Sequence, residues 1–280
     1  MYLKKLTFIT IVLTYFLIVF GGYVASSESG MGCGPDWPLC NGEVIPELQG
    51  ETLIEFGHRV IGAILFIFTS IIFWKLKTED NSKVRHVANW LLTLLIIQLI
   101  MGAIVVFYHL PPVIITIHLL IAMIFLALLI WIWRNQSHAS SEKSQSLKKH
   151  FHFLTLLLII TIGLGAYVKH NHYGLACGWL TCNNSFFPNS ISGFFQTIHR
   201  YVAFIVSIHI VYITYYVFQN NLSLLKGRMV VATIIIFIQL LIGILTILSN
   251  ISISYAVIHL AAATLLFAIV IETSFVIRKD

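Results

Sequence analysis

Charged residues are scarce in this sequence of 280 residues: Asp, Glu, Lys and Arg make up 10% of it, against about 25% in a soluble domain. Hydrophobic residues make up 58%, and the mean hydropathy is +0.90. Whole stretches are apolar on every face, which excludes an amphipathic soluble bundle, and they are long enough to cross a hydrocarbon core of about 30 Å. The sequence therefore predicts a polytopic membrane protein. Its net charge of +6 indicates membrane topology rather than affinity for nucleic acid.

Eight apolar stretches are predicted to be transmembrane helices, each near the roughly 20 residues that a span requires. They cover residues 6–24, 53–74, 87–107, 112–133, 151–168, 194–218, 228–249 and 253–277. The first is not expected to be a cleaved secretory signal, because it exceeds the roughly 7–15 residues of a signal core. We expect an N-terminal half over residues 1–133, a polar cytoplasmic linker over 134–150 and a C-terminal half over 151–280.

Positive charge is missing from the loop over residues 26–52, which contains acidic residues but neither Lys nor Arg. The loops after the second, fourth and sixth helices, together with both termini, hold 14 of the 17 Lys and Arg residues. These surfaces are predicted to face the cytoplasm. We therefore expect a multi-pass protein of the cell membrane, with both termini cytoplasmic and the cysteine-containing loops extracytoplasmic.

A short motif is repeated: residues 55–59 (EFGHR) recur as residues 196–200 (QTIHR), 141 positions later. The same offset relates further residues, namely Gln98 to Gln239, Gly102 to Gly243, His118 to His259 and Gly22 to Gly163. We interpret the pattern as a tandem duplication without a gap. Because each half has four helices, an even number, the all-α fold is expected to be two four-helix bundles related by a pseudo-twofold axis along the membrane normal.

Four histidines occupy equivalent places in the predicted helices: His58, His118, His199 and His259. Each lies five or six residues from the outer end of its predicted helix, so the four imidazoles are expected at similar depth. An ionisable group inside a membrane is costly, so its repetition indicates a functional site. We predict that His58 pairs with His118 and that His199 pairs with His259, each pair holding one metal.

Zinc fits these histidines poorly, because neither Asp nor Cys accompanies them in the apolar regions. Haem requires only one or two axial ligands and a large apolar slot, which the sequence supplies twice. Arg59 and Arg200 directly follow histidines and are candidates for contacts with haem propionates. Alternatively, the histidines only hydrogen-bond to neighbouring helices and the arginines anchor helix ends.

The two halves differ in charge at the first position of the repeated motif, where the first half has Glu55 and the second has Gln196. Only the first half therefore keeps a titratable group one helical turn from its histidine. A catalytic half beside a structural or electron-carrying half would show this asymmetry. Alternatively, Glu55 only neutralises Arg59 four residues later.

The cysteines form two close pairs, Cys33 with Cys40 and Cys177 with Cys182, each in a loop before a histidine-bearing helix. A location outside the membrane favours disulfides. Closing such short loops contributes at most about 2–3 kcal/mol, so a redox role also stays open. A zinc site built from both pairs is the weaker alternative, because the spacings are not CxxC.

The cysteine segment 33–42 (CGPDWPLCNG), the two repeated motifs, His118 and His259 resemble the haem A synthases of the COX15/CtaA family. The likeness covers the whole chain and is greatest to the bacterial type with a cysteine pair in the first outer loop. The resemblance implies an eight-helix oxidoreductase that oxidises the C8 methyl group of haem O to the formyl group of haem A, for use by terminal oxidases.

The same resemblance implies roles for individual residues. His58 and His118 would bind haem O or haem A, whereas His199 and His259 would bind haem b. Glu55 would be the catalytic carboxylate, and the Cys33–Cys40 pair would pass reducing equivalents or fix the loop over the site. The implied partners are the haem O substrate, the haem O synthase and an electron donor that the sequence does not identify.

Two other functions fit part of the pattern. A di-haem b-type electron-transfer cytochrome would also contain paired histidines, but it would not need Glu55 in one half only. A haem or ion transporter would have helices interrupted by Gly or Pro at its binding site, whereas Pro111 and Pro112 lie at a helix entrance.

Overall fold

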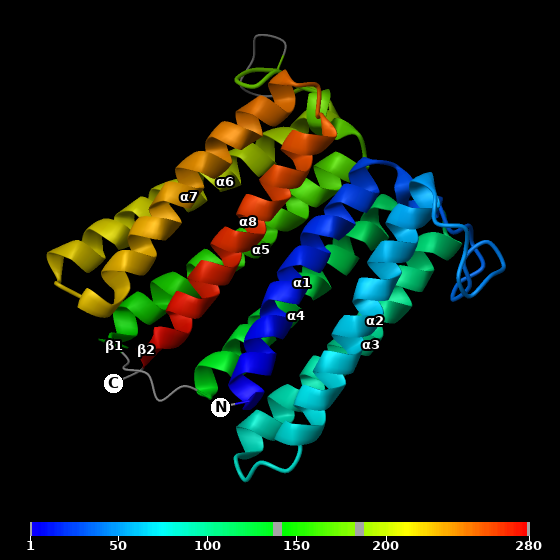
Figure 1. The fold of residues 1–280 in the computed structure, drawn as a ribbon. Coiled ribbons are helices and arrows are strands. Elements are labelled where there is room, and N and C mark those ends of the chain that lie inside the picture. The colour runs from blue at the N-terminus through cyan, green and yellow to red at the C-terminus, as the bar shows by residue number, and fades with distance from the viewer. Residues whose placement is uncertain (1, 137–141, 183–187, 279–280) are drawn as a thin grey trace. The chain divides into compact units, whose positions relative to one another are not determined.

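The computed structural model describes residues 2–136, 142–182 and 188–278 and divides the chain into two compact units, Met1–Ser137 and His138–Asp280. Within the described residues, eight helices are long and apolar enough to span a membrane (Figure 1). The predicted all-α, eight-helix polytopic fold is confirmed.

The first unit is a ring of four helices. In chain order they are α1 (Tyr2–Ser26), α2 (Gly50–Leu76), α3 (Ser82–Phe107) and α4 (Pro112–Asn135). Both α1 and α3 pack against α2 and α4, so α2 and α4 lie diagonally across the bundle. A short 3-10 helix, η1 (Ser29–Met31), follows α1 and packs against α2 in the loop that contains the first cysteine pair.

The second unit has the same arrangement. Its helices are α5 (Gln145–His170), α6 (Ile191–Gln219), α7 (Ser223–Leu248) and α8 (Ile253–Val276), with the 3-10 helix η2 (Tyr173–Leu175) after α5. Both α5 and α7 pack against α6 and α8, which therefore lie diagonally opposed. The two-residue strands β1 (Glu142–Lys143) and β2 (Ile277–Arg278) pair in parallel within this unit.

Several helices extend beyond the apolar runs that predicted them. Helix α5 begins six residues before the expected 151, because Ser144 caps it by accepting a hydrogen bond from the Leu147 backbone N–H. Asn81 caps α3 in the same way. Part of the expected 134–150 linker is therefore helical, while its residues 137–141 lie outside the described residues. An apolar run marks where lipid surrounds a helix, whereas caps mark where the helix begins.

The duplication is not free of gaps, which corrects the sequence interpretation. Helices α3 and α7 end 141 residues apart, at Phe107 and Leu248, but α1 and α5 end 144 residues apart, at Ser26 and His170. The 3-10 helices η1 and η2 are also separated by 144 residues. The second cysteine loop is thus three residues shorter than the first, and the expected equivalence of Gly22 with Gly163 is wrong.

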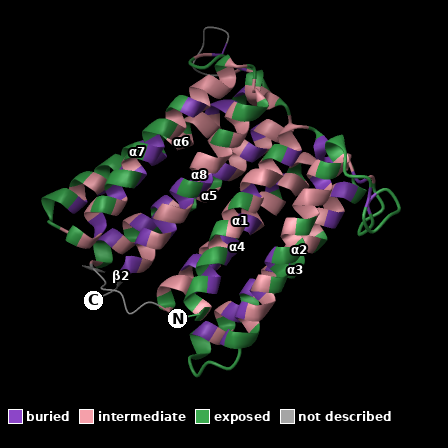
Figure 2. Ribbon diagram, viewed as in Figure 1, coloured by how far each residue is buried: buried purple, intermediate pink, exposed green. Residues whose placement is uncertain are grey.

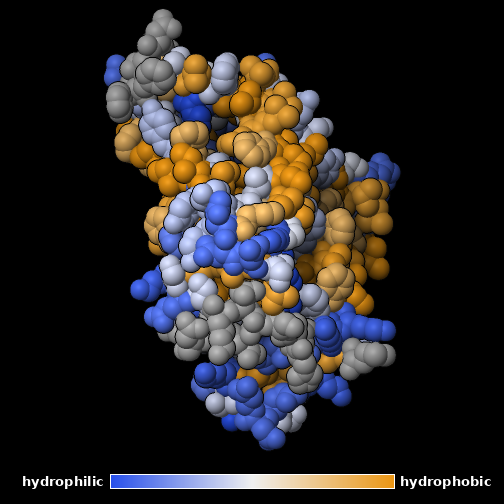
Figure 3. All heavy atoms as spheres, turned by 90° about the vertical axis from the view of Figure 1, so that its left-hand side faces the viewer, coloured by the Kyte–Doolittle hydropathy of each residue, from blue (hydrophilic) through white to orange (hydrophobic). Residues whose placement is uncertain are grey.

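The tightly packed core of the first unit lies in the half of the bundle away from the cysteine loop. It contains Leu65, Ile72 and Leu76 of α2, packed with Val84–Leu95 of α3 and Phe125–Ile132 of α4. Figure 2 shows buried and exposed residues alternating along the helices, and Figure 3 shows apolar side chains over much of the visible surface. Along α2 and α4, His58 and His118 lie between this core and the end of the bundle that carries the cysteine loop.

Candidate functional site

The four predicted histidines lie on the diagonally opposed helices of their units. His58 is on α2 and His118 is on α4, the two helices that lie diagonally across the first bundle. His199 on α6 and His259 on α8 repeat this relation in the second unit. His58 and His199 lie eight residues into their helices, about 12 Å along the axis, because the helices begin earlier than predicted. Each predicted pair is thus contained in one bundle.

His199 is held by the backbone of α5. Its Nδ1 atom lies 3.0 Å from the carbonyl oxygen of Thr161. Because a carbonyl only accepts hydrogen bonds, Nδ1 carries the proton and Nε2 is left with its lone pair. Histidines that bind metals commonly donate their other ring N–H to such an acceptor, which orients the ring.

A glutamine accompanies the second histidine of each pair. The Gln98 Nε2 atom donates to the His118 backbone carbonyl at 2.9 Å, whereas the Gln239 Nε2 atom lies 3.4 Å from His259 Nε2. The side-chain oxygens of both glutamines and the Nδ1 atoms of both histidines are buried without a hydrogen-bond partner. Such atoms are rare, because leaving them unpaired costs about 1–3 kcal/mol each.

The donor set fits haem better than a metal held by protein ligands alone. Within the described residues, no group of three or more His, Cys, Asp or Glu side chains is placed to hold a metal ion. Two imidazoles on facing helices suffice as the axial ligands of a haem iron. Four of the buried unpartnered polar atoms in the described residues belong to Gln98, His118, Gln239 and His259, where a ligand with polar edges could satisfy them.

Glu55 is buried, with 4% of its surface exposed, and joins α2 to the first cysteine loop. Its Oε2 atom accepts a hydrogen bond from the Cys33 backbone N–H at 2.8 Å. Its Oε1 atom accepts from Nε and Nη2 of Arg59 and forms an ion pair with this guanidinium. The Arg59 Nη1 atom then donates to the Leu39 carbonyl at 2.9 Å. The i, i+4 pairing expected from the sequence is therefore present, and it is part of a larger network.

Gln196 takes the position of Glu55 in the second unit and bonds the same backbone group. Its Oε1 atom accepts from the Cys177 backbone N–H at 2.7 Å, while its Nε2 atom donates to the Gly174 carbonyl at 2.6 Å. Arg200 makes no ion pair with this neutral side chain. It donates from Nη1 to the Gly178 carbonyl at 2.6 Å and from Nη2 to Thr197 Oγ1 at 3.4 Å.

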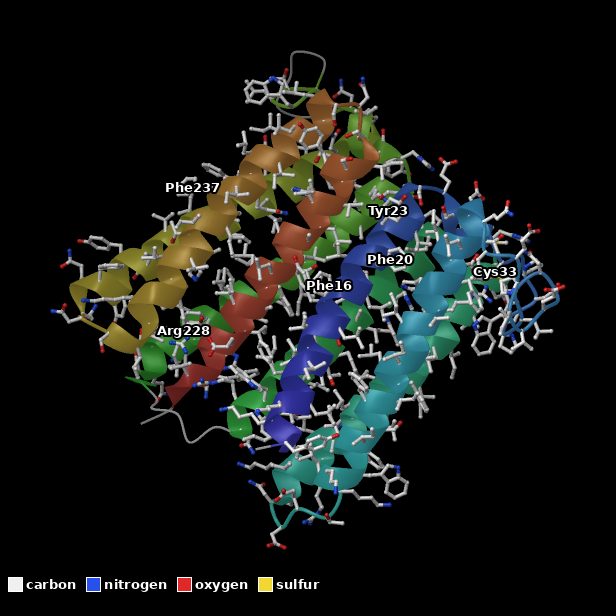
Figure 4. The ribbon with its side chains drawn as sticks, in the orientation of Figure 1. Phe16, Phe20, Tyr23, Cys33, Arg228 and Phe237 are labelled. Atoms are coloured by element: carbon white, nitrogen blue, oxygen red, sulfur yellow. A yellow bond between two sulfur atoms is a disulfide. The ribbon has the colours of Figure 1, made fainter. Side chains whose placement is uncertain are left out.

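Both cysteine pairs are disulfides, Cys33–Cys40 and Cys177–Cys182, as the sequence predicts. The alternative zinc site is wrong, because all four sulfur atoms are already bonded. Figure 4 shows Cys33 in the loop at one end of the first unit. Phe20 and Tyr23 of α1 lie toward the same end. The Phe20 ring lies 6.0 Å from the His58 ring and stacks on Tyr23 at 6.2 Å, so aromatic side chains line this end of the histidine pair.

The sequence interpretation predicted the helix that precedes each histidine helix but missed the contact that it makes with the histidine. Thr161, whose carbonyl orients His199, has no side-chain signal at all, because a backbone atom makes the contact. Two of the glycines that adjoin the histidines, Gly21 and Gly165, are related by an offset of 144, which also relates Cys33 to Cys177. The offset of 141 concealed it.

Comparison with known proteins identifies the family. The family model described as cytochrome oxidase assembly protein, COX15-CtaA, matches residues 4–271. The chain is 29% identical to the heme A synthase of Listeria welshimeri over 96% of this chain and 93% of that protein. It is 30% identical to the heme A synthase of Macrococcus caseolyticus, over 95% and 94%, and 28% identical to that of Bacillus licheniformis, over 95% and 93%. The chain therefore belongs to the COX15-CtaA family of cytochrome oxidase assembly proteins.

Proposed function

We propose that this protein is a haem A synthase, an oxidoreductase that converts the C8 methyl group of haem O to the formyl group of haem A. One observation carries the proposal. The two histidine sites are similar, but only the first has a buried carboxylate, Glu55, beside it. The names of the relatives support the same reaction. A chain with two equal haem sites would have no need of this asymmetry.

The first unit is proposed to bind the substrate. His58 and His118, on facing helices, would hold haem O before the reaction and haem A after it. The side of the first bundle toward the cysteine loop suits a large apolar ligand, because the packed core occupies the other end. Phe20 adds an aromatic face beside His58.

Glu55 is proposed as the catalytic carboxylate. A formyl carbon is four electrons more oxidised than a methyl carbon, and four protons leave if water supplies the oxygen. An ionised carboxylate accepts a proton or stabilises developing positive charge. Glu55 Oε2 accepts one hydrogen bond, from Cys33, and so retains a lone pair for this task. Arg59 holds the other oxygen atom of this carboxylate through their ion pair, which fixes the position of Glu55.

The second unit is proposed to hold haem b through His199 and His259. Haem b, when bound, supplies one-electron transfer. The protein contributes orientation, since the Thr161 carbonyl fixes the tautomer and the ring direction of His199. Arg59 and Arg200 lie one residue after the first histidine of each pair and are proposed to contact the haem propionates.

The location of the protein in the cell membrane and its orientation there are also proposed. The distribution of Lys and Arg supports a multi-pass protein of the cell membrane with cytoplasmic termini and extracytoplasmic disulfides. Haem O synthase and an electron donor are the proposed partners. A pseudo-twofold axis along the membrane normal is also proposed to relate the bundles, which the even helix number per unit supports.

Extraction and chromatography of haems from the purified protein test the function. The protein is produced with and without an enzyme that supplies haem O. We expect haem b alone without the supply, and haem O together with haem A when it is present. Two haem b molecules per chain in both cases would reject the synthase and make the protein a di-haem electron-transfer cytochrome.

A further inference from the structure

Each of the four histidines lies against a glycine of the preceding helix. The contacts join Gly21 to His58, Gly102 to His118, Gly165 to His199 and Gly243 to His259. A Cβ atom at Gly165 would lie 2.8 Å from the His199 ring, and one at Gly21 or Gly243 would lie 3.1 Å from its histidine. Carbon atoms pack favourably at about 3.5–4.0 Å, so a methyl group at Gly165 requires the His199 ring to move, and one at Gly21 or Gly243 requires a smaller shift of its histidine. At Gly102 the distance is 3.7 Å, which a methyl group tolerates.

Crowding also occurs at glycines in or beside the cysteine loops, where a Cβ atom at Gly32, Gly174 or Gly193 would lie 2.4–2.8 Å from its nearest neighbour. Glycines further along the helices are not always crowded. Gly62 lies on α2 one turn after His58, and Gly227 lies in α7, yet an added Cβ at either would meet nothing within 4 Å. Glycine is unfavourable inside a helix by about 0.5–1 kcal/mol relative to alanine. Its presence against three imidazoles therefore indicates a requirement for space.

His199 is fixed from two sides by one turn of α5. The Thr161 carbonyl binds its Nδ1 atom, and Gly165, four residues later, lies against the ring edge that contains Cε1, Nδ1 and Nε2. A methyl group at position 165 would push the ring away from the carbonyl. The hydrogen bond and the close helix approach thus depend on the same glycine.

His58 lacks this second restraint. In the described part of the chain its ring makes no hydrogen bond, and the atom nearest to the Gly21 Cβ position is Nε2 rather than the Cε1 edge. Leu17, which corresponds to Thr161 at the offset of 144, leaves its carbonyl unused by this imidazole. The first unit therefore leaves its histidine able to turn, while the second unit does not.

We propose that Gly165 is a positioning residue that, with the Thr161 carbonyl, locks His199 for a permanently held haem, whereas His58 is left unlocked so that substrate and product can exchange. The dependence on glycine follows the contact distance: strongest at Gly165, weaker at Gly21 and Gly243 and absent at Gly102. The inference rests on the proposed function and deepens it, because it assigns retention and release to the two units.

The test is a series of glycine-to-alanine variants of the full chain: Gly165→Ala, Gly243→Ala, Gly102→Ala and Gly227→Ala. Haem b per chain is measured by extraction, and the ligand field of the iron by optical and electron paramagnetic resonance spectra. Loss of an orienting contact to a metal ligand typically lowers affinity about 10- to 100-fold, which is the expectation for Gly165→Ala. Gly243→Ala should show a smaller loss. Gly102→Ala and Gly227→Ala, which gain the same methyl group without a clash, should match the wild type.

The haem of the first unit serves as an internal control for folding, since Gly165→Ala should leave it unchanged. Unaltered haem b content and spectrum in Gly165→Ala would overturn the inference, as would equal losses in Gly165→Ala and Gly227→Ala. If Gly165→Ala is not recovered as folded protein, Gly243→Ala decides, and wild-type haem b in it would overturn the graded dependence. If the wild-type protein binds haem b but forms no haem A, only the proposed function is rejected. If the wild-type protein binds no haem at all, the proposed function and the role of Gly165 are both rejected.

Discussion

The two units attach their cysteine loops in the same way but with side chains of different charge. Glu55 and Gln196 each accept a hydrogen bond from the backbone N–H of the first cysteine, at 2.8 and 2.7 Å. A neutral amide performs this structural task in the second unit, so the task does not require a negative charge. The carboxylate of Glu55 is an additional property of the first unit.

That additional charge is costly to keep. Removing a carboxylate and a guanidinium from water costs several kcal/mol per ion, and a buried pair regains this only with good geometry. Glu55 meets the condition through Arg59 and Cys33. The second unit keeps Arg200 and omits the acid, which shows that the arginine does not depend on an ion pair to bind its loop carbonyl. The comparison favours a chemical role for Glu55.

Removing a histidine is expected to have the largest effect and to separate the units. His199→Ala should lose haem b, because one of two axial ligands is gone, and should keep haem O bound. His58→Ala should do the reverse and abolish haem A formation. Haem extraction from both purified variants checks this, and retention of haem b in His199→Ala would contradict the assignment of the second unit.

Replacing the carboxylate comes next. Glu55→Gln copies the residue of the second unit and preserves the acceptor for the Cys33 N–H. We expect both haems to remain and haem A formation to fall about 100-fold or more, since general acid–base groups contribute about 10²–10⁴-fold. Product yield per bound haem O is the measurement. A wild-type yield of haem A would show that Glu55 has no catalytic role and serves only as the ion-pair partner of Arg59.

Removing the disulfides should have a moderate and unequal effect. Each double Cys→Ser variant is expected to lose about 2–3 kcal/mol of stability, from the short loops that are closed. Cys33→Ser with Cys40→Ser should also slow haem A formation, because the loop carries the N–H that positions Glu55. Cys177→Ser with Cys182→Ser should not. Equal rates of haem A formation in the two double variants would show that the first cysteine loop takes no part in the active site.

The smallest effect on haem A formation is expected from Gln196→Glu. The new carboxylate would face the Gly174 carbonyl, to which Gln196 now donates at 2.6 Å, so we expect a loss of about 1–3 kcal/mol in stability. Haem A formation should stay near that of the wild type, because the second unit performs no oxidation. Thermal unfolding and product yield together check this.

Much of this comparison was predictable from the sequence because the residues involved are chemically distinctive. Four histidines, the Glu55 and Gln196 difference and two cysteine pairs are visible by type and spacing alone. The helices were predictable because their apolar runs are continuous, although their ends were not. Ser144 begins α5 six residues before the expected start through a cap that hydropathy does not report.

The remaining features depend on space rather than on residue type. Gly165 is one of 17 glycines in the sequence, and only the packing of α5 on α6 distinguishes it. The offset of 141 also misaligned α1 with α5, since the second loop is three residues shorter. The bond between Cys33 and Glu55 was not predictable, because it joins a backbone N–H to a side chain 22 residues away.

The most direct test of the account exchanges the two side chains in one protein, Glu55→Gln with Gln196→Glu, and measures haem A per chain. The account predicts that both haem sites remain filled and that haem A formation stays as low as in Glu55→Gln alone, because the carboxylate is then in the unit that does not bind substrate. Haem A formation restored toward the wild-type level would contradict the assignment of catalysis to the first unit.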